Sequence, residues 1–185
     1  MAIPITEARI REIAHAAGEL WLKFLGSLGP DFPAPFLFKE YPGTTVNPWV
    51  LRLFKFCCVN HLHVNTYKAF PVITRLTGTR AAPSWLWDNG GSNIAILIDQ
   101  VQVQTLIPID RRQKVVARLV LHEIGHIVLH LKALTPMSSG HVNSASPEQE
   151  EEAWVFCGTI LGLALGHVAR SSRPHVIDAA WTHAA

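Results

Sequence analysis

The stretch His122-Glu123-Ile124-Gly125-His126 decides the fold and the chemistry that we expect of this chain. Residues four positions apart lie on one face of a helix, so the two imidazoles can reach a single metal ion. The carboxylate beside the first histidine is then placed to take a proton from a water molecule. The five residues match the H-E-x-x-H pattern of zinc hydrolases, which requires a helix here and a third ligand elsewhere.

The sequence around this motif predicts a long, buried helix. Asp110, with Gln113 three residues later, reads as an N-terminal capping box, and we expect the helix to run from Arg111 to Leu134. Apolar residues cover most of its circumference, and one stripe consists of Val116, Val120, Ile124, Ile127 and Leu131. Two imidazoles and a carboxylate on such a helix must be paired, hydrogen-bonded or bound to metal. The alternative is that both histidines are ordinary core residues.

A second helix supplies candidates for the third ligand. Ser146 as N-cap, Pro147 in the first turn and Gln149 at N3 mark its start, and its apolar segment ends near Leu165. Acidic residues in a first turn suit the helix dipole. Four glutamates within five residues, however, repel one another unless a cation is near.

Glu150 is the preferred ligand among these glutamates. It shares a helix face with residues that lead into the apolar segment, namely Ala153, Trp154 and Cys157. Glu152 and then Glu151 are the substitutes, and a solvated helix cap without metal is the alternative.

These residues resemble a known family. The series H-E-I-G-H-I-V-L-H from His122 to His130, preceded by Arg112-Gln113 and followed by E-x-x-A-x-x-F from Glu150, looks like the ImmA/IrrE metallopeptidase family. The resemblance is specific over about residues 94–165 and only architectural over residues 1–90. Two positions depart from the family pattern: Trp154 stands where the family usually has Asn, and Cys157 where it has Ala.

The resemblance implies a function as well as a site. Zinc would be held by His122, His126 and Glu150, with Glu123 as the catalytic base of a gluzincin-like endopeptidase. The substrate would be a protein or peptide, and site-specific cleavage of a regulatory partner such as a transcriptional repressor is the activity implied. Without its usual Asn, the site would have hydrogen-bond support at this position only from the Trp154 indole N–H.

Other residues are candidates for roles near the metal. His130 lies about 12 Å along a straight helix from His122, too far to share one ion, so it is a helix-end residue or a group that supports the ligands. His141 lies in the loop from Thr135 to Ser146 between the two ligand-bearing helices. It is a candidate oxyanion stabiliser or substitute ligand, or else a flexible surface histidine. Tyr67 and His63 are further oxyanion candidates.

Composition limits the remaining function classes. A chain of 185 residues predicts a single domain with a true core. The formal net charge of +2 argues against direct nucleic-acid binding, and no apolar run reaches the roughly 18–20 residues of a membrane span. The first residues do not read as a signal peptide, and three cysteines (Cys57, Cys58 and Cys157) suit a reducing compartment. We therefore expect a cytoplasmic protein without a membrane partner.

The N-terminal part predicts helices. An amphipathic helix is expected from Thr6 to Leu28, with an inner face of Ile10, Ile13, Ala17, Leu20, Trp21, Phe24 and Leu28. Residues 30–45 are rich in proline and aromatics and predict an extended wrap over the core. Asn47-Pro48 opens a second helix, expected to end near His61.

Strands follow in the predicted core, residues 46–165. They run from Tyr67 to Arg75 and from Ser84 to Asp99, the second broken by a hairpin at Asp88-Asn89-Gly90-Gly91. Val101 to Ile107 adds a short strand, and residues 166–185 form a loosely ordered tail with a short helix near Asp178.

The fold class that we expect is therefore α+β and zincin-like. The H-E-x-x-H helix and the glutamate-bearing helix pack beside a small, mostly antiparallel sheet, whose edge strand could hold an extended peptide. Two other function classes remain open. One is a zinc-binding regulatory interaction module without peptidase activity, which Trp154 favours and Glu123 opposes. The other is a metal-free helical interaction protein with a fortuitous motif.

Overall fold

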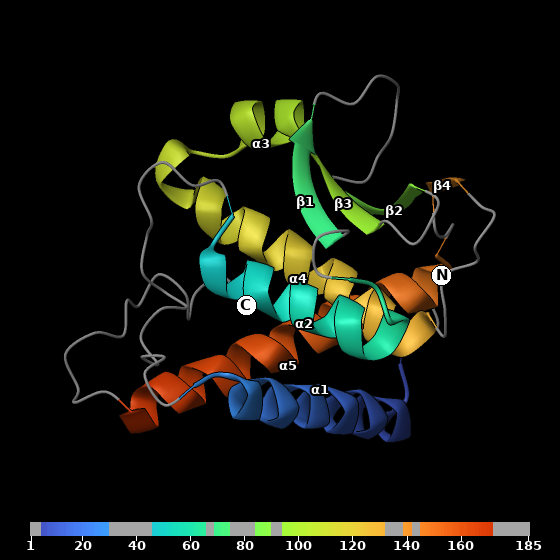
Figure 1. The fold of residues 1–185 in the computed structure, drawn as a ribbon, viewed down its shortest axis with the longest axis vertical. Helices are drawn as coiled ribbons and strands as arrows, with labels where there is room; N and C mark the ends of the chain where they lie inside the picture. The colour runs from blue at the N-terminus through green and yellow to red at the C-terminus, as the bar shows by residue number, and fades with distance from the viewer. Residues whose placement is uncertain are drawn as a thin grey trace.

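The computed structural model describes residues 5–29, 46–65, 69–74, 84–89, 94–131, 139–141 and 145–171. Helices make up most of this described part, and four short strands form one sheet (Figure 1). Helix α4 (Arg112–His130) lies between the sheet and α5 (Pro147–Ser171), and α1 (Glu7–Ser27) packs along the other side of α5. The helix that carries the H-E-x-x-H motif is therefore the central element.

Helix α1 has the start that the sequence predicts. The Thr6 hydroxyl caps it by accepting a hydrogen bond from the Arg9 backbone N–H at 3.3 Å. Its buried face consists of Ile13, Ala17, Leu20, Trp21 and Phe24. Ile10 was predicted to join this face but is 42 % exposed.

Helix α2 (Pro48–Leu62) completes an aromatic contact with α1. The Asn47 side chain caps it by accepting from the Trp49 N–H, and Trp49 then packs against Trp21 with ring centroids 5.0 Å apart. His63 ends the helix in the left-handed conformation, at φ 54°. The predicted end near His61 is thus correct to one residue.

The sheet has the strand order β1-β3-β2-β4. β3 (Ile94–Asp99) is parallel to β1 (Ala69–Thr74) and antiparallel to β2 (Ser84–Asn89), while β2 is also antiparallel to β4 (Ser139–His141). β2 and β3 form the hairpin that the Asp-Asn-Gly-Gly signal predicts, and two of three pairings are antiparallel, as expected. β4 was not predicted, because three residues carry too little periodicity to be recognised.

The segment after β3 contradicts the sequence prediction. Val101 to Ile107 was expected as a strand, yet Gln100–Leu106 form helix α3. Asp99 caps this helix by accepting hydrogen bonds from the backbone N–H groups of Val101 and Gln102. A cap residue placed directly after a buried strand outweighs the alternation of valine and glutamine.

The start of α4 also differs from its prediction. Asp110 does not cap it; residues Ile109–Arg111 form a 3₁₀ turn, and the N-cap Arg111 makes no side-chain cap. The Arg112 guanidinium holds this junction instead, by donating to the carbonyl oxygens of Ile107 and Gln104 at 3.0 and 2.7 Å. The helix ends at His130 rather than Leu134.

The start of α5 matches its prediction in detail. Ser146 N–H donates to the Gln149 side chain at 3.0 Å, and Gln149 N–H donates to the Ser146 hydroxyl at 3.3 Å, which is a reciprocal capping box. The helix runs to Ser171, so the predicted boundary of a loose tail at Gly166 is wrong. The predicted wrap at 30–45, Tyr67 and residues 172–185 lie outside the described residues.

Candidate metal centre

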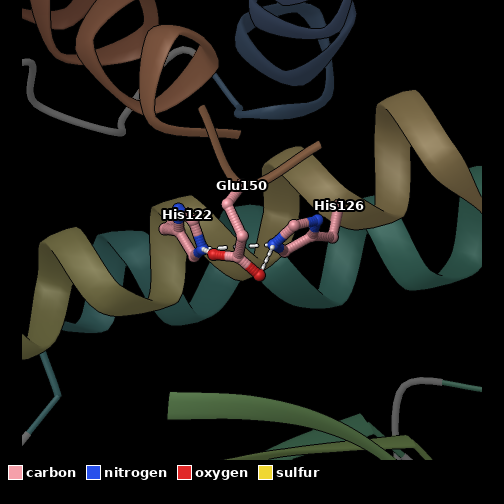
Figure 2. Close-up of side chains that lie close together, drawn as sticks. All are labelled: His122, His126 and Glu150. Atoms are coloured by element: carbon pink, nitrogen blue, oxygen red, sulfur yellow. Dashed lines mark hydrogen bonds and ion pairs between the residues drawn. The ribbon is translucent and has the colours of Figure 1, made fainter. Parts of the chain in front are cut away.

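Three residues bring their donor atoms together where α5 crosses α4. His122 and His126 lie one turn apart on α4 and are only 4 % and 5 % exposed, while Glu150 comes from the first turn of α5 (Figure 2). The two histidine Nε2 atoms are 3.1 Å apart. The Glu150 carboxylate oxygens lie 3.1 Å from His122 Nε2 and 3.5 Å from His126 Nε2.

This spacing fits a tetrahedral ion. Metal–ligand bonds of about 2.0–2.1 Å separate neighbouring tetrahedral ligands by about 3.3–3.4 Å. The three observed separations, from 3.1 to 3.5 Å, lie close to that value, and the two that involve Glu150 are made by different oxygens of its carboxylate. Two imidazoles and one carboxylate are also the ligand set of catalytic zinc sites, which keep a fourth position for water or substrate. His122, His126 and Glu150 therefore form a group that could hold a metal ion.

The crossing is close because two small residues meet in it. A Cβ atom added to Gly125 would lie 3.0 Å from the Cα and the carbonyl oxygen of Ala153. Glycine therefore lets the backbone of α4 approach α5, and Glu150, one turn before Ala153, is carried to the two histidines. The motif glycine has a packing reason that the sequence alone did not reveal.

Burial sets the charge of the ligands. It lowers the pKa of His122 to about 4, with a further contribution from the nearby His130, so His122 is neutral near pH 7 and its ring can offer a lone pair. The side chain of Glu150 is 49 % exposed, yet partial burial of its carboxyl raises its pKa, against the opposing effect of His130. A cation between the three groups would satisfy all of them at once.

The predicted base, Glu123, is held by the sheet. Its side chain is buried, and its Oε1 accepts a hydrogen bond of 2.6 Å from the hydroxyl of Ser84, the first residue of β2. Ser84 was not among the predicted site residues, since a serine that opens a strand carries no distinguishing signal. β2 thus fixes the orientation of the carboxylate beside the first histidine.

Trp154 supports His122 by stacking rather than by a hydrogen bond. Its ring lies 4.2 Å from that of His122, centroid to centroid, with an angle of 35° between the planes. The buried Nδ1 of His122 has no hydrogen-bond partner within the part of the chain that the structure describes. Trp154 is 41 % exposed, so one side of the site carries an accessible aromatic ring.

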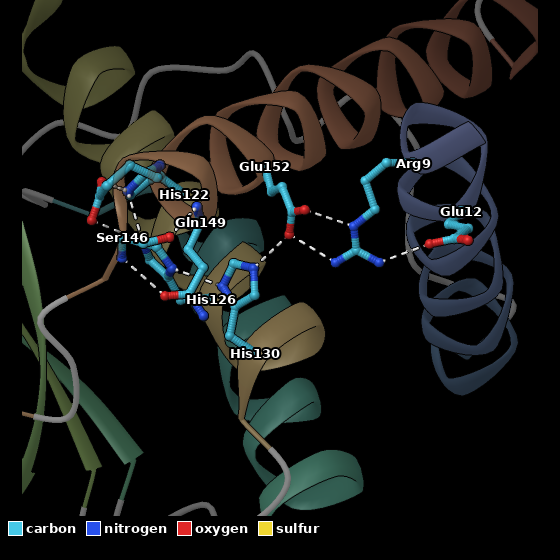
Figure 3. Close-up of polar contacts among 9 residues, drawn as sticks. Arg9, Glu12, His122, His126, His130, Ser146, Gln149 and Glu152 are labelled. Atoms are coloured by element: carbon cyan, nitrogen blue, oxygen red, sulfur yellow. Dashed lines mark hydrogen bonds and ion pairs between the residues drawn. The ribbon is translucent and has the colours of Figure 1, made fainter. Parts of the chain in front are cut away.

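The remaining candidates are not in the donor cluster. His130 Nδ1 lies 3.1 Å from His126 Nδ1, and His130 Nε2 lies 2.9 Å from Glu152. Glu152 pairs with Arg9 of α1 at 2.7 Å, and this contact is the largest cause that lowers the pKa of Glu152 to about 2 (Figure 3). Its carboxylate is engaged by Arg9 and His130 and is not in the donor group found among the described residues. Glu151 is exposed.

Two of the three candidates for oxyanion stabilisation, His141 and His63, lie in the described segments of the chain. His141 is the last residue of β4 and pairs with Trp87 of β2 through the backbone. His63 is exposed at the end of α2, and Tyr67 lies outside the described residues. His63 is not in the donor group found among the described residues.

The cysteines do not compete for the metal. Cys57, Cys58 and Cys157 are buried and unbridged. Burial raises the pKa of Cys58 and of Cys157 to about 12, so both remain thiols near pH 7.

No family model, curated protein or solved structure matches this chain. The resemblance to the ImmA/IrrE metallopeptidases therefore remains a prediction that rests on the motif residues. None of the helices in the described ranges combines the length and the hydrophobicity that a transmembrane span requires.

Proposed function

We propose that this chain is a zinc-dependent peptidase of the H-E-x-x-H type with a zincin-like fold. The observation that carries the proposal is the convergence of His122, His126 and Glu150, with donor atoms 3.1 to 3.5 Å apart, beside the buried Glu123. A site that only joined two helices would have no need for a base next to its first ligand.

The roles of the residues follow from their positions. A zinc ion in this site would supply Lewis acidity, which acidifies a water molecule and polarises a carbonyl group. Glu123 would accept the proton of the attacking water and return it to the leaving amine. Ser84, by holding one oxygen of the Glu123 carboxylate, would keep that group oriented during both transfers.

The sheet offers a place for the substrate. β2 pairs with β4 over Trp87–Asn89, while its first residue, Ser84, contacts Glu123. A peptide that extended the sheet at this end of β2 would bring its backbone to the base. By the resemblance described above, the substrate class is a regulatory protein such as a transcriptional repressor, cut at one site.

Zinc content is the first test. The wild-type chain and a Glu150→Ala variant would be purified in parallel without chelator and compared by elemental analysis. The proposal predicts about one zinc per wild-type chain and a clear loss in the variant. Full zinc in the variant would exclude Glu150 as a ligand, and wild-type protein without zinc would refute the proposal.

Peptide cleavage is the second test. A peptide library digested with zinc-loaded wild type and with Glu123→Gln would be analysed by mass spectrometry. The variant should keep its zinc and lose about 10²–10⁴ in rate, because only the proton acceptor is removed. Equal rates in both proteins would exclude Glu123 as the base.

One observation favours a second candidate, a zinc-binding regulatory module without peptidase activity. The exposed ring of Trp154 lies directly against His122, where it could restrict access of a substrate to the site. Zinc in the wild type together with no cleavage of the library would select this function.

A further inference from the structure

We infer that Arg9, Glu152 and His130 are positioning residues that orient the metal ligand His126, so that α1 is part of the metal centre. The inference rests on the proposed metal site and adds a support that reaches it from the N-terminal helix.

A continuous series of polar contacts links His126 to α1 (Figure 3). His126 Nδ1 lies 3.1 Å from His130 Nδ1, and His130 Nε2 lies 2.9 Å from Glu152 Oε2. The His130 side chain is 5 % exposed and that of Glu152 is 14 % exposed. Both contacts are therefore shielded from competition with water, which is the condition under which hydrogen bonds orient a group strongly.

One arrangement of protons satisfies every contact in the series. If His126 binds metal through Nε2, its proton is on Nδ1 and is donated to His130 Nδ1. His130 then carries its own proton on Nε2, from which it donates to Glu152 Oε2. The Glu152 carboxylate can only accept, so it is a suitable last acceptor of the series. The series therefore favours the His126 tautomer with its proton on Nδ1, which leaves the Nε2 lone pair facing the other ligands.

Arg9 locks the far end of the series. Its Nε and Nη2 donate to the two Glu152 oxygens, each at 2.7 Å, and its Nη1 donates to Glu12 at 2.9 Å. This paired geometry is specific to a guanidinium, and a lysine ammonium cannot reproduce it. Glu152 is held between α1 and α4, and it cannot turn away from His130 without losing both bonds to Arg9.

The two histidine ligands differ in this respect. His126 is supported by the series, whereas the buried Nδ1 of His122 has no hydrogen-bond partner in the described ranges and its ring is held by Trp154. An exposed ion pair usually contributes little to stability. The Glu152 carboxylate, however, also accepts a hydrogen bond from the buried ring of His130, which contacts the proposed ligand His126. Arg9 and Glu152, 143 residues apart, thus join helix packing to metal binding.

The test measures zinc release from the loaded protein into an excess of a chromogenic chelator. His130→Gln keeps a donor toward Glu152 but loses the ring nitrogen that accepts from His126, so release should be about 10–100-fold faster. Arg9→Ala should speed release severalfold, and Arg9→Lys should lie near Arg9→Ala, because the fork is lost. Arg11→Ala is the matched control, since Arg11 pairs with Glu7 on the exposed side of α1, and it should match the wild type.

A second measurement separates positioning from stability. The visible spectrum of the cobalt-substituted protein should change in Arg9→Ala and not in Arg11→Ala, at a temperature at which the metal-free forms of both variants are still folded. If Arg9→Ala and His130→Gln release zinc at the wild-type rate and show the wild-type cobalt spectrum, the inference is wrong. The proposed metal site would not be affected by that result. Faster release in Arg11→Ala equal to that in Arg9→Ala would also overturn it. A wild type that binds neither zinc nor cobalt would overturn both.

Discussion

Replacing Gly125 with alanine tests whether the close crossing of α4 and α5 assembles the metal centre. The new Cβ would lie 3.0 Å from two backbone atoms of Ala153, and backbone cannot swing aside as a flexible side chain can. The two helices must then separate by a few tenths of an ångström. Glu150 moves with α5 and the two histidines with α4, so the donor atoms are drawn apart.

Two opposing effects decide the stability of Gly125→Ala. Overpacking of a core contact costs about 1–3 kcal/mol, whereas alanine in place of glycine inside a helix stabilises by about 0.8–1 kcal/mol. The expected net change is a loss of up to about 2 kcal/mol, with a fall in melting temperature of about 2–4 °C for each kcal/mol in a chain of this size. Zinc–ligand distances tolerate deviations of only about 0.2 Å, so the separation of the helices should lower zinc affinity by about 10–100-fold.

Gly162→Ala provides the matched control. Gly162 lies inside α5, and outside its own helix no atom of the described residues lies within 4 Å of the position of its new Cβ. Helix propensity then acts alone, and the variant should be more stable by about 0.5–1 kcal/mol with unchanged zinc affinity. Thermal unfolding of the metal-free proteins and competition with a chelator would measure both quantities. If Gly125→Ala gained as much stability as Gly162→Ala and kept its zinc, the close crossing would not be what assembles the site.

Three further predictions concern the surroundings of the ligands. Ser84→Ala removes a buried hydrogen bond to the Glu123 carboxylate, so unfolding in urea should show a loss of about 1–3 kcal/mol, and full stability would exclude the contact. Trp154→Ala removes a ring contact worth about 0.5–1.5 kcal/mol, so chelator competition should show zinc bound about 2–10-fold more weakly, with most of the affinity kept in Trp154→Phe. Acid should destabilise the metal-free protein, because the pKa of His122 is lowered from 6.5 to about 4 on folding and the unfolded chain therefore binds more protons. The contribution of His122 to the free energy of unfolding is fully present above pH 6.5 and falls by roughly 3 kcal/mol by pH 4. Urea titrations of His122→Asn should not show this dependence on pH. The pKa of Glu152 is lowered from 4.5 to about 2 on folding, so protonation of this group should cause a further loss of stability as the pH falls below 4.5.

Local patterns predicted the starts of α2 and α5, whereas the cap that they indicated for α4 at Asp110 is not formed. Ser146 and Gln149 form the capping box that their spacing indicates, and Asn47 caps α2. These signals depend on residues two or three positions apart, which lie close together at the start of a helix. Short segments were predicted less well. Polar and apolar residues alternate in Gln100–Leu106 as they do in a strand, but this segment follows the cap residue Asp99 and forms a helix.

The sequence by itself determined which residues can bind a metal and on which helices they lie. The i, i+4 spacing of His122 and His126 fixes their shared face, and the face of Glu150 follows from the apolar residues after it. Tertiary structure decided what surrounds them. Ser84 reaches Glu123 across 39 positions in the chain, and Arg9 reaches Glu152 across 143. Periodicity shows which face of an element is buried but not which element covers it, so such contacts appear only once the helices and the sheet have packed.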